Sequence, residues 1–354
     1  MVLLNMLRLS GHESFFKDHE EDINSIFSKL WDYKKIEESG IDVLQQSMNS
    51  SLGILLNCCI FMIDKHKERC IPERYKTLLI ESLSMKGQEY YVSLCIIAGH
   101  YGFFHYRDAE WCNKMFNLAL SGELSEEEYI YSWDGFVLYT GGLSVDNVDD
   151  LKRVFLKAIE KIGLLSLDAH YRFIDLYVTL LFNAVKHPNA YYIPRFYLYA
   201  SDDDKRYFVS VIGHRFEKMD AEKKMRQWEK WIKRHLANRT INKPVKPIEL
   251  ELQEYLEWLP HLREVYDAAV DIMCKGLLPK KIGILFFDDL IKSNLPETNP
   301  ESTCRLLISL CKSGSKSEWN DGSIKKIKNM MSTLPTKESQ ILDNELVKNG
   351  WINI

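Results

Sequence analysis

Apolar residues recur at steps of three and four almost throughout this chain of 354 residues, and this spacing constrains its fold most strongly. In residues 22–36, Ile23, Phe27 and Leu30 form one such stripe. The only run that suggests a strand, KIGILFF at 281–287, is also compatible with a short helix. The spacing predicts further helices within residues 51–70, 73–85, 87–104, 108–122, 125–142, 148–165, 168–188, 201–219, 223–239, 248–276, 279–293, 299–314, 324–331 and 337–351.

Short polar loops separate these segments, and the chain has only 17 glycines and 10 prolines, few for strands joined by tight turns. Helices joined by short loops favour antiparallel neighbours. We therefore expect an all-α fold, specifically an α-solenoid of degenerate HEAT/armadillo-like antiparallel helix pairs. Polar residues 238–249 predict a division into an N-terminal helical array, 1–240, and a C-terminal helical subdomain, 241–354, packed on it; residues 293–302 form a weaker break.

The eight cysteines lie mostly in apolar runs and show no zinc-ligand spacing, which favours buried, reduced thiols. The opening residues 1–15 lack the cleavage pattern of a signal peptide and are expected to form a helix or another ordered segment. No apolar stretch is long enough to cross a membrane. These features predict a cytoplasmic protein that does not contact a membrane.

Residues 223–239 place tryptophans among lysines and arginines, a combination that also occurs in nucleic-acid-binding surfaces. At 100° per residue, however, the aromatic and basic side chains separate onto opposite faces. This separation predicts packing rather than base stacking. The apolar face is expected to carry Met225, Trp228, Trp231, Ile232 and Leu236, and the opposite face Arg226, Lys230, Lys233 and Arg234.

Arg239 falls on the tryptophan face if the helix continues that far. A buried guanidinium needs a carboxylate partner, and Glu251 or Glu254 on the next helix is near enough to supply one. We therefore predict a structural clamp across residues 238–249.

The net charge is −4, so the chain as a whole has no bias toward nucleic acid. Residues 205–246 nevertheless carry a charge of +9, and residues 247–271 a charge of −6. Either these segments neutralise each other as neighbours, or the basic one binds phosphates or an acidic partner. The tyrosine-rich stretch 187–208 allows two interpretations as well: tyrosines packed between helices, or a contact surface that includes Arg195, Tyr197 and Tyr199.

Five stretches of the chain, residues 83–116, 131–159, 228–262, 306–314 and 342–351, share a sparse pattern of tryptophan, arginine, proline and aliphatic residues. In this pattern the chain resembles the helical C-terminal region of large bacterial antiphage defence proteins that carry an N-terminal sirtuin-type domain. In that family the sirtuin-type part hydrolyses NAD after infection, and the helical part is thought to sense or restrain. The matching residues are Trp228, Trp231, Arg239, Pro244 and Trp258, and the resemblance implies an architectural role for them, with Glu251 completing the clamp.

The chain has no glycine-rich NAD loop, phosphate loop, zinc-protease motif or serine-nucleophile elbow. His100 and His105, with Asp108 and Glu110 nearby, are more typical of capping or packing residues than of a metal site. We expect no catalytic residues, cofactor or metal, and a scaffold that binds a protein: an effector subunit, a phage protein or a second copy. The alternative is nucleic-acid binding through the basic helix 223–239. An enzyme whose site is assembled from distant residues is the third class.

Overall fold

The computed structural model describes residues 19–34, 43–66, 69–120, 124–140, 148–316 and 321–352. Over these ranges the regular structure is helical, apart from one parallel bridge between Lys281 and Lys316. The all-α prediction is confirmed. The run 281–287 meets that bridge and then enters a helix at Phe286. Residues 1–15, expected to form a helix or another ordered segment, lie outside the described residues.

The chain forms two compact units, Met1–Ala184 and Val185–Ile354. The division therefore lies at 184/185 and not at 240/241, the position expected from the polar stretch 238–249. Residues on both sides of that stretch belong to the second unit, because side chains from the flanking helices join across it, as described below. The stretch 293–302, the weaker expected break, is itself partly helical.

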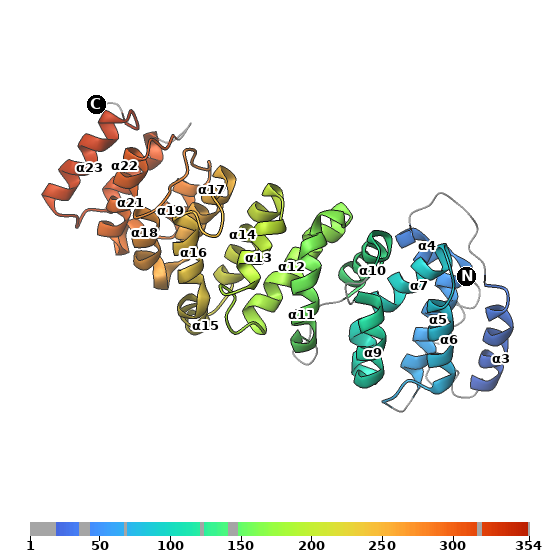
Figure 1. Cartoon of the computed structure of the whole chain (residues 1–354). Coiled ribbons are helices and arrows are strands. Elements are labelled where there is room, and N and C mark those ends of the chain that lie inside the picture. The colour runs from blue at the N-terminus through green and yellow to red at the C-terminus, as the bar shows by residue number, and fades with distance from the viewer. Residues whose placement is uncertain are drawn as a thin grey trace. The chain divides into compact units, whose positions relative to one another are not determined.

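The first unit contains helices that pack mostly against elements one to three places away in the chain (Figure 1). They are α3 (Glu20–Trp31), α4 (Val43–Asn49), α5 (Ser51–Lys65), α6 (Glu73–Leu83), α7 (Gln88–Gly99), α8 (Tyr101–Arg107), α9 (Ala109–Leu120), α10 (Glu126–Tyr139), α11 (Val148–Ala158), the 3₁₀ segment η1 (Ile159–Leu164) and α12 (Leu167–Asn183). The caps agree with the sequence: Ser125 and Glu128 form a capping box that starts α10, and Asp108 accepts from the Trp111 amide at the start of α9.

The centre of the first unit is the crossing of α7 and α10, where the backbones approach closely at Gly135. A Cβ placed on Gly135 would stand 2.2 Å from the carbonyl oxygen of Cys95, so only glycine fits there. Trp133, on the same helix, packs against Phe155 and Phe173 with ring centroids 5.2 and 5.3 Å away. Apolar and aromatic packing therefore holds this unit together.

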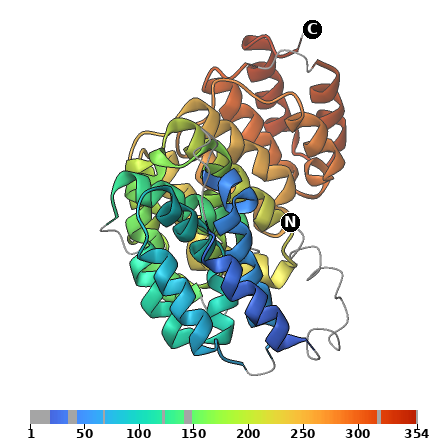
Figure 2. The ribbon, with the colours of Figure 1, turned by 90° about the vertical axis from the view of Figure 1, so that its right-hand side faces the viewer.

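The second unit also consists of helices packed against near neighbours, and both views place α21 beside α23 (Figures 1 and 2). Its elements are α13 (Tyr192–Tyr199), α14 (Asp202–Glu217), α15 (Ala221–Gln227), the π-helical η2 (Trp228–Ile232), α16 (Lys233–Thr240), α17 (Glu249–Trp258), the 3₁₀ segments η3 (Leu259–His261) and η4 (Arg263–Val265), α18 (Tyr266–Cys274), α19 (Phe286–Lys292), α20 (Leu295–Thr298), α21 (Pro300–Lys312), α22 (Asp321–Met330) and α23 (Thr336–Lys348).

None of the eight cysteines forms a disulfide, as predicted, and six of them are buried. Cys70 and Cys274 are the exceptions, each partly exposed near the end of a predicted segment. Among the described helices, none by itself combines the length and apolarity needed to cross a bilayer, although the bent pair α4–α5 meets that criterion when its two parts are joined.

Candidate functional site

The predicted basic helix forms one continuous rod made of α15, η2 and α16. In its middle turn the amide of Lys233 donates to the carbonyl of Trp228, five residues earlier, so this turn is wider than an α-helical one. Trp228, Trp231 and Leu236 are buried, as the helical wheel predicted. π-helical turns of this kind occur often at functional sites.

The prediction for Met225 was wrong, because its side chain is 42% exposed. Lys224 takes the inward position and is only 5% exposed, four residues before Trp228 on the same face. Its stem packs inside while its ammonium reaches Glu264 Oε2 at 3.2 Å. The wheel assigned faces by hydropathy and could not foresee a buried lysine with a partner some 40 residues away.

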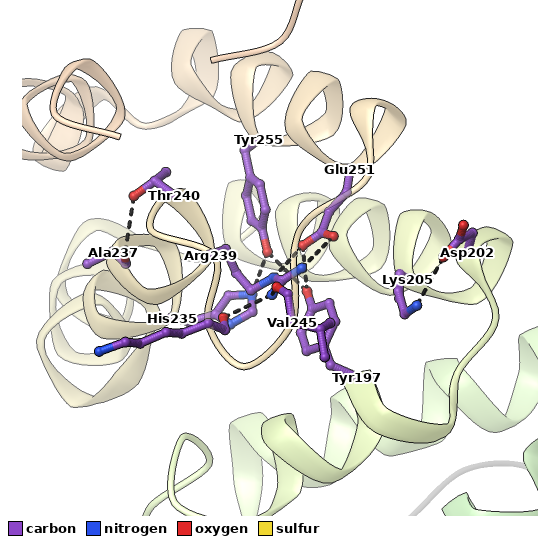
Figure 3. Close-up of polar contacts among 11 residues, drawn as sticks. Tyr197, Asp202, Lys205, His235, Ala237, Arg239, Thr240, Val245, Glu251 and Tyr255 are labelled. Atoms are coloured by element: carbon purple, nitrogen blue, oxygen red, sulfur yellow. Dashed lines mark hydrogen bonds and ion pairs between the residues drawn. The ribbon is translucent and has the colours of Figure 1, made fainter. Parts of the chain in front are cut away.

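Arg239 and Glu251 form the predicted clamp, and both side chains are fully buried (Figure 3). Arg239 donates from Nε to Glu251 Oε1 at 2.6 Å and from Nη2 to Oε2 at 2.8 Å, a bidentate pair. Glu254, the other carboxylate considered, instead accepts from Arg206 at 3.0 Å near the surface. The clamp joins the end of α16 to the start of α17.

The same guanidinium also holds the connecting loop. Its Nη1 donates to the carbonyl oxygens of Lys243 and Val245 at 2.9 and 2.6 Å. Pro244, between them, follows a cis peptide bond. One side chain therefore fixes both helices and the loop, which explains why residues 238–249 do not separate two domains.

Tyr197 belongs to this cluster and not to a contact surface, so that part of the prediction was wrong. The Arg239 guanidinium lies 3.9 Å from the centroid of the Tyr197 ring, and the Tyr197 hydroxyl donates to Glu251 Oε1 at 3.0 Å. The ring is 1% exposed because α13 turns it toward the ion pair. Arg195 and Tyr199, from the same helix, remain partly and substantially exposed, respectively.

His235 and Tyr255 complete the cluster and were missed by the sequence analysis. The Tyr255 hydroxyl lies 2.8 Å from His235 Nε2 and 3.2 Å from the Tyr197 hydroxyl (Figure 3). The sequence did contain an indication that His235 is buried, because it lies four residues after Trp231, on the apolar face of the helical wheel.

Burial dominates the electrostatics of this cluster. It lowers the pKa of His235 to about 3, with the charge of Arg239 as the second cause, so the imidazole is neutral at pH 7. Burial also raises the pKa values of Tyr197 and Tyr255, keeping both as phenols. For Arg239, burial disfavours the charge, but the hydrogen bonds to Glu251 outweigh it and the pKa is raised. The cluster thus holds one saturated ion pair among neutral groups, an arrangement suited to structural support.

The basic residues predicted to face solvent do so: Arg226, Lys230, Lys233 and Arg234 are all exposed. We call these four residues the basic face. Lys233 pairs with Glu229 one turn earlier at 3.2 Å, an exposed contact that contributes little stability. Trp258, expected to have an architectural role, is buried and packs against the Tyr255 ring with centroids 4.8 Å apart.

The histidines considered as metal ligands have other contacts. His100 Nδ1 lies 2.9 Å from the carbonyl oxygen of Ile96, and the Asp108 carboxylate pairs with Lys76 besides capping α9. Within the described ranges, no group of three or more His, Cys, Asp or Glu side chains is placed to hold a metal ion.

Two of the hollows lined by described residues lie near the rod, both in the second unit. A cavity of about 220 Å³ lies beside the clamp, lined among others by Ile193, His235 and Pro244. A larger, polar pocket of about 400 Å³ lies at the start of the rod, with Lys224 in its wall.

No family model, curated protein or solved structure matches this chain.

Proposed function

We propose that this chain is a helical interaction module that makes and breaks no bonds itself and binds an acidic protein partner through the basic face. The observation that carries the proposal is the division of the rod into two sides: Trp228, Trp231 and Arg239 are buried, while Arg226 and Arg234 are exposed. The buried side anchors the helix, and four cations stand on its solvent side. A rigid basic surface steers and orients a negatively charged partner.

The architecture that we propose for this module is an α-solenoid of degenerate HEAT/armadillo-like antiparallel helix pairs. The packing of helices against near neighbours within each unit supports it. In such arrays each pair buries its apolar face against the next, and broad outer surfaces remain available for binding.

A protein partner is favoured over nucleic acid because the indoles of the rod point inward. Single-stranded nucleic acid is usually bound by exposed aromatic rings beside cations, and Trp228 and Trp231 are each 1% exposed. Duplex binding through phosphates alone stays the alternative for the same four cations. It predicts affinity for DNA or RNA that falls steeply with salt.

The cellular setting that we propose, on the resemblance described above, is the cytoplasm of a bacterium and an antiphage defence system. The partner is then an effector subunit, a phage protein or another copy of this chain. An NAD-hydrolysing activity would belong to such an effector or to a sirtuin-type domain joined to this chain. The purified chain alone is expected to hydrolyse no NAD, and measurable hydrolysis would refute its non-catalytic role.

The test is co-purification of the chain with the products of adjacent reading frames, using a variant that reverses Lys230, Lys233 and Arg234 to Glu. We expect the wild type to retain a partner and the variant to lose it, without a change in melting temperature. The matched control reverses three exposed lysines of α21 and α23, Lys312, Lys337 and Lys348, and should retain the partner.

Two outcomes count against the proposal: equal retention by both variants, and salt-sensitive nucleic-acid binding in place of any protein. The defence role is tested in cells, where co-expression of the wild-type chain with its neighbours should reduce phage plaque numbers more than the triple variant does.

A further inference from the structure

The polar pocket at the start of the rod is built from five elements of the second unit. Its volume of about 400 Å³ falls in the range of roughly 300–1,000 Å³ usual for small-molecule sites. The lining residues come from α14, α15, the 3₁₀ segments η3 and η4, and α19 with the residue after it. They are Glu217, Lys224, Pro260, His261, Arg263, Glu264, Asp289, Lys292 and Ser293.

Each carboxylate of the pocket already has a nitrogen partner. Glu264 pairs with Lys224 at 3.2 Å, and Asp289 pairs with Lys292 at 2.9 Å. Glu217 Oε1 lies 3.3 Å from His261 Nδ1. Arg263 is different: it is exposed, and its charge attracts the neighbouring Glu264 carboxylate without a direct contact. Within the described part of the chain it has no ion pair or side-chain hydrogen bond. Its guanidinium donors are therefore available to a ligand.

Lys224 adds a second available donor. Its ammonium group has three N–H bonds, and its two contacts are the Glu264 carboxylate and the carbonyl oxygen of His261 at 3.3 Å. The third N–H has no acceptor among the described residues. Because Lys224 lines the pocket, this N–H is available to an anion bound there.

We propose that this pocket binds a small anion that also carries hydroxyl groups, namely a sugar phosphate or a sugar acid. Arg263 and the third N–H of Lys224 bind the anionic group. Glu217 and Asp289 each use one carboxylate oxygen for the nitrogen partner named above, and their other oxygens accept from the ligand's hydroxyls. A neutral sugar lacks the charge for Arg263, and a bare anion lacks donors for these carboxylates.

This proposal is independent of the proposed interaction surface, because none of the four residues of the basic face lines the pocket. Loss of partner binding in the triple charge-reversal variant therefore says nothing about the pocket. Likewise, a failure to bind sugars leaves the interaction surface untouched.

The test is isothermal titration calorimetry of the full chain with four probes: ribose 5-phosphate, gluconate, ribose and inorganic phosphate. At least one charged sugar should bind ten-fold or more tightly than both ribose and inorganic phosphate. The two charged probes distinguish phosphate from carboxylate as the anionic group. No binding of either charged sugar overturns the proposal, and so does equal binding of inorganic phosphate, which would indicate an adventitious ion only.

Variants then assign the residues. Arg263→Met should weaken binding of the preferred probe at least ten-fold without lowering the melting temperature, whereas Arg263→Lys should retain part of the affinity because it keeps the charge but not the forked donors. Arg153→Met, which changes another exposed arginine, on α11, is the matched control and should bind as the wild type does. Wild-type affinity in Arg263→Met would overturn the assignment. Lys224→Met should also weaken binding; its melting temperature separates that effect from unfolding.

Discussion

The α7–α10 crossing of the first unit and the Arg239–Glu251 clamp of the second are two different ways to join helices. At the crossing, Gly135 lets two backbones touch, and aromatic rings surround the contact. At the clamp, a bidentate ion pair lies fully buried between helix ends and a loop. Packing at the crossing depends on shape, and the clamp depends on charge balance. The two should therefore respond differently to substitution.

The largest effect is expected from Arg239→Met. The variant leaves the Glu251 carboxylate buried without its partner, and breaking a buried pair in this way costs about 3–5 kcal/mol of unfolding free energy. Urea denaturation followed by tryptophan fluorescence measures the loss.

The double variant Arg239→Met/Glu251→Met supplies the control. Replacing both partners by apolar groups of similar size removes the unpaired charge, so part of the loss should be recovered, although the carbonyl oxygens of Lys243 and Val245 still lack their donor. A single variant as stable as the wild type would contradict the clamp.

Gly135→Ala tests the crossing. The added methyl group collides with the Cys95 carbonyl, so the helices must separate, at a cost of about 1–3 kcal/mol. Gly163→Ala is the matched control, because a Cβ there meets nothing within 4 Å. Equal melting temperatures for the two variants would mean that the close approach is unimportant.

The next largest effect is expected from pH, through the buried His235 beside the clamp. The unfolded chain protonates His235 below about pH 6.5, whereas burial keeps the folded side chain neutral down to a pKa of about 3. The unfolded state then binds more protons, so the unfolding free energy falls as the pH falls through this window. The slope approaches about 1.4 kcal/mol per pH unit.

Burial lowers the pKa of His100 in the first unit as well, so both units contribute in the same direction. Urea titrations at about pH 7 and about pH 5.5 should show a smaller difference for His235→Phe than for the wild type. If the unfolding free energy differs between the two pH values by the same amount in the variant and in the wild type, His235 does not cause the pH dependence.

The smallest effect is expected from Lys233→Ala. The pair with Glu229 is exposed on both sides, so its loss should change the unfolding free energy by less than about 0.5 kcal/mol. Differential scanning calorimetry at low and high salt would detect a larger role, which would place Lys233 in a structural network.

Helical spacing predicted the all-α fold well, because periodicity is a local property that each segment carries by itself. The clamp was also accessible, since Arg239 fell on an apolar face and acidic residues followed within a short distance. Tyr197 and Lys224 were assigned to the wrong side or overlooked because their partners, Glu251 and Glu264, lie roughly 40 to 55 residues away in sequence. Hydropathy predicts that a lysine is exposed and makes no clear prediction for a tyrosine. Whether either side chain is buried depends on its tertiary contacts.

The widened turn at Trp228–Ile232 sets the direction, around the helix axis, in which the side chains of α16 point. A ring closed over five residues holds one amino acid more than an α-helical turn, and each amino acid advances an α-helix by about 100°. Deleting Glu229 should therefore restore α-helical winding and leave the direction of Arg239 nearly unchanged. Deleting one residue of α16 before Arg239 should instead rotate its side chain by about 100°, away from Glu251. Single-residue gaps should thus be tolerated within the widened turn and not in α16.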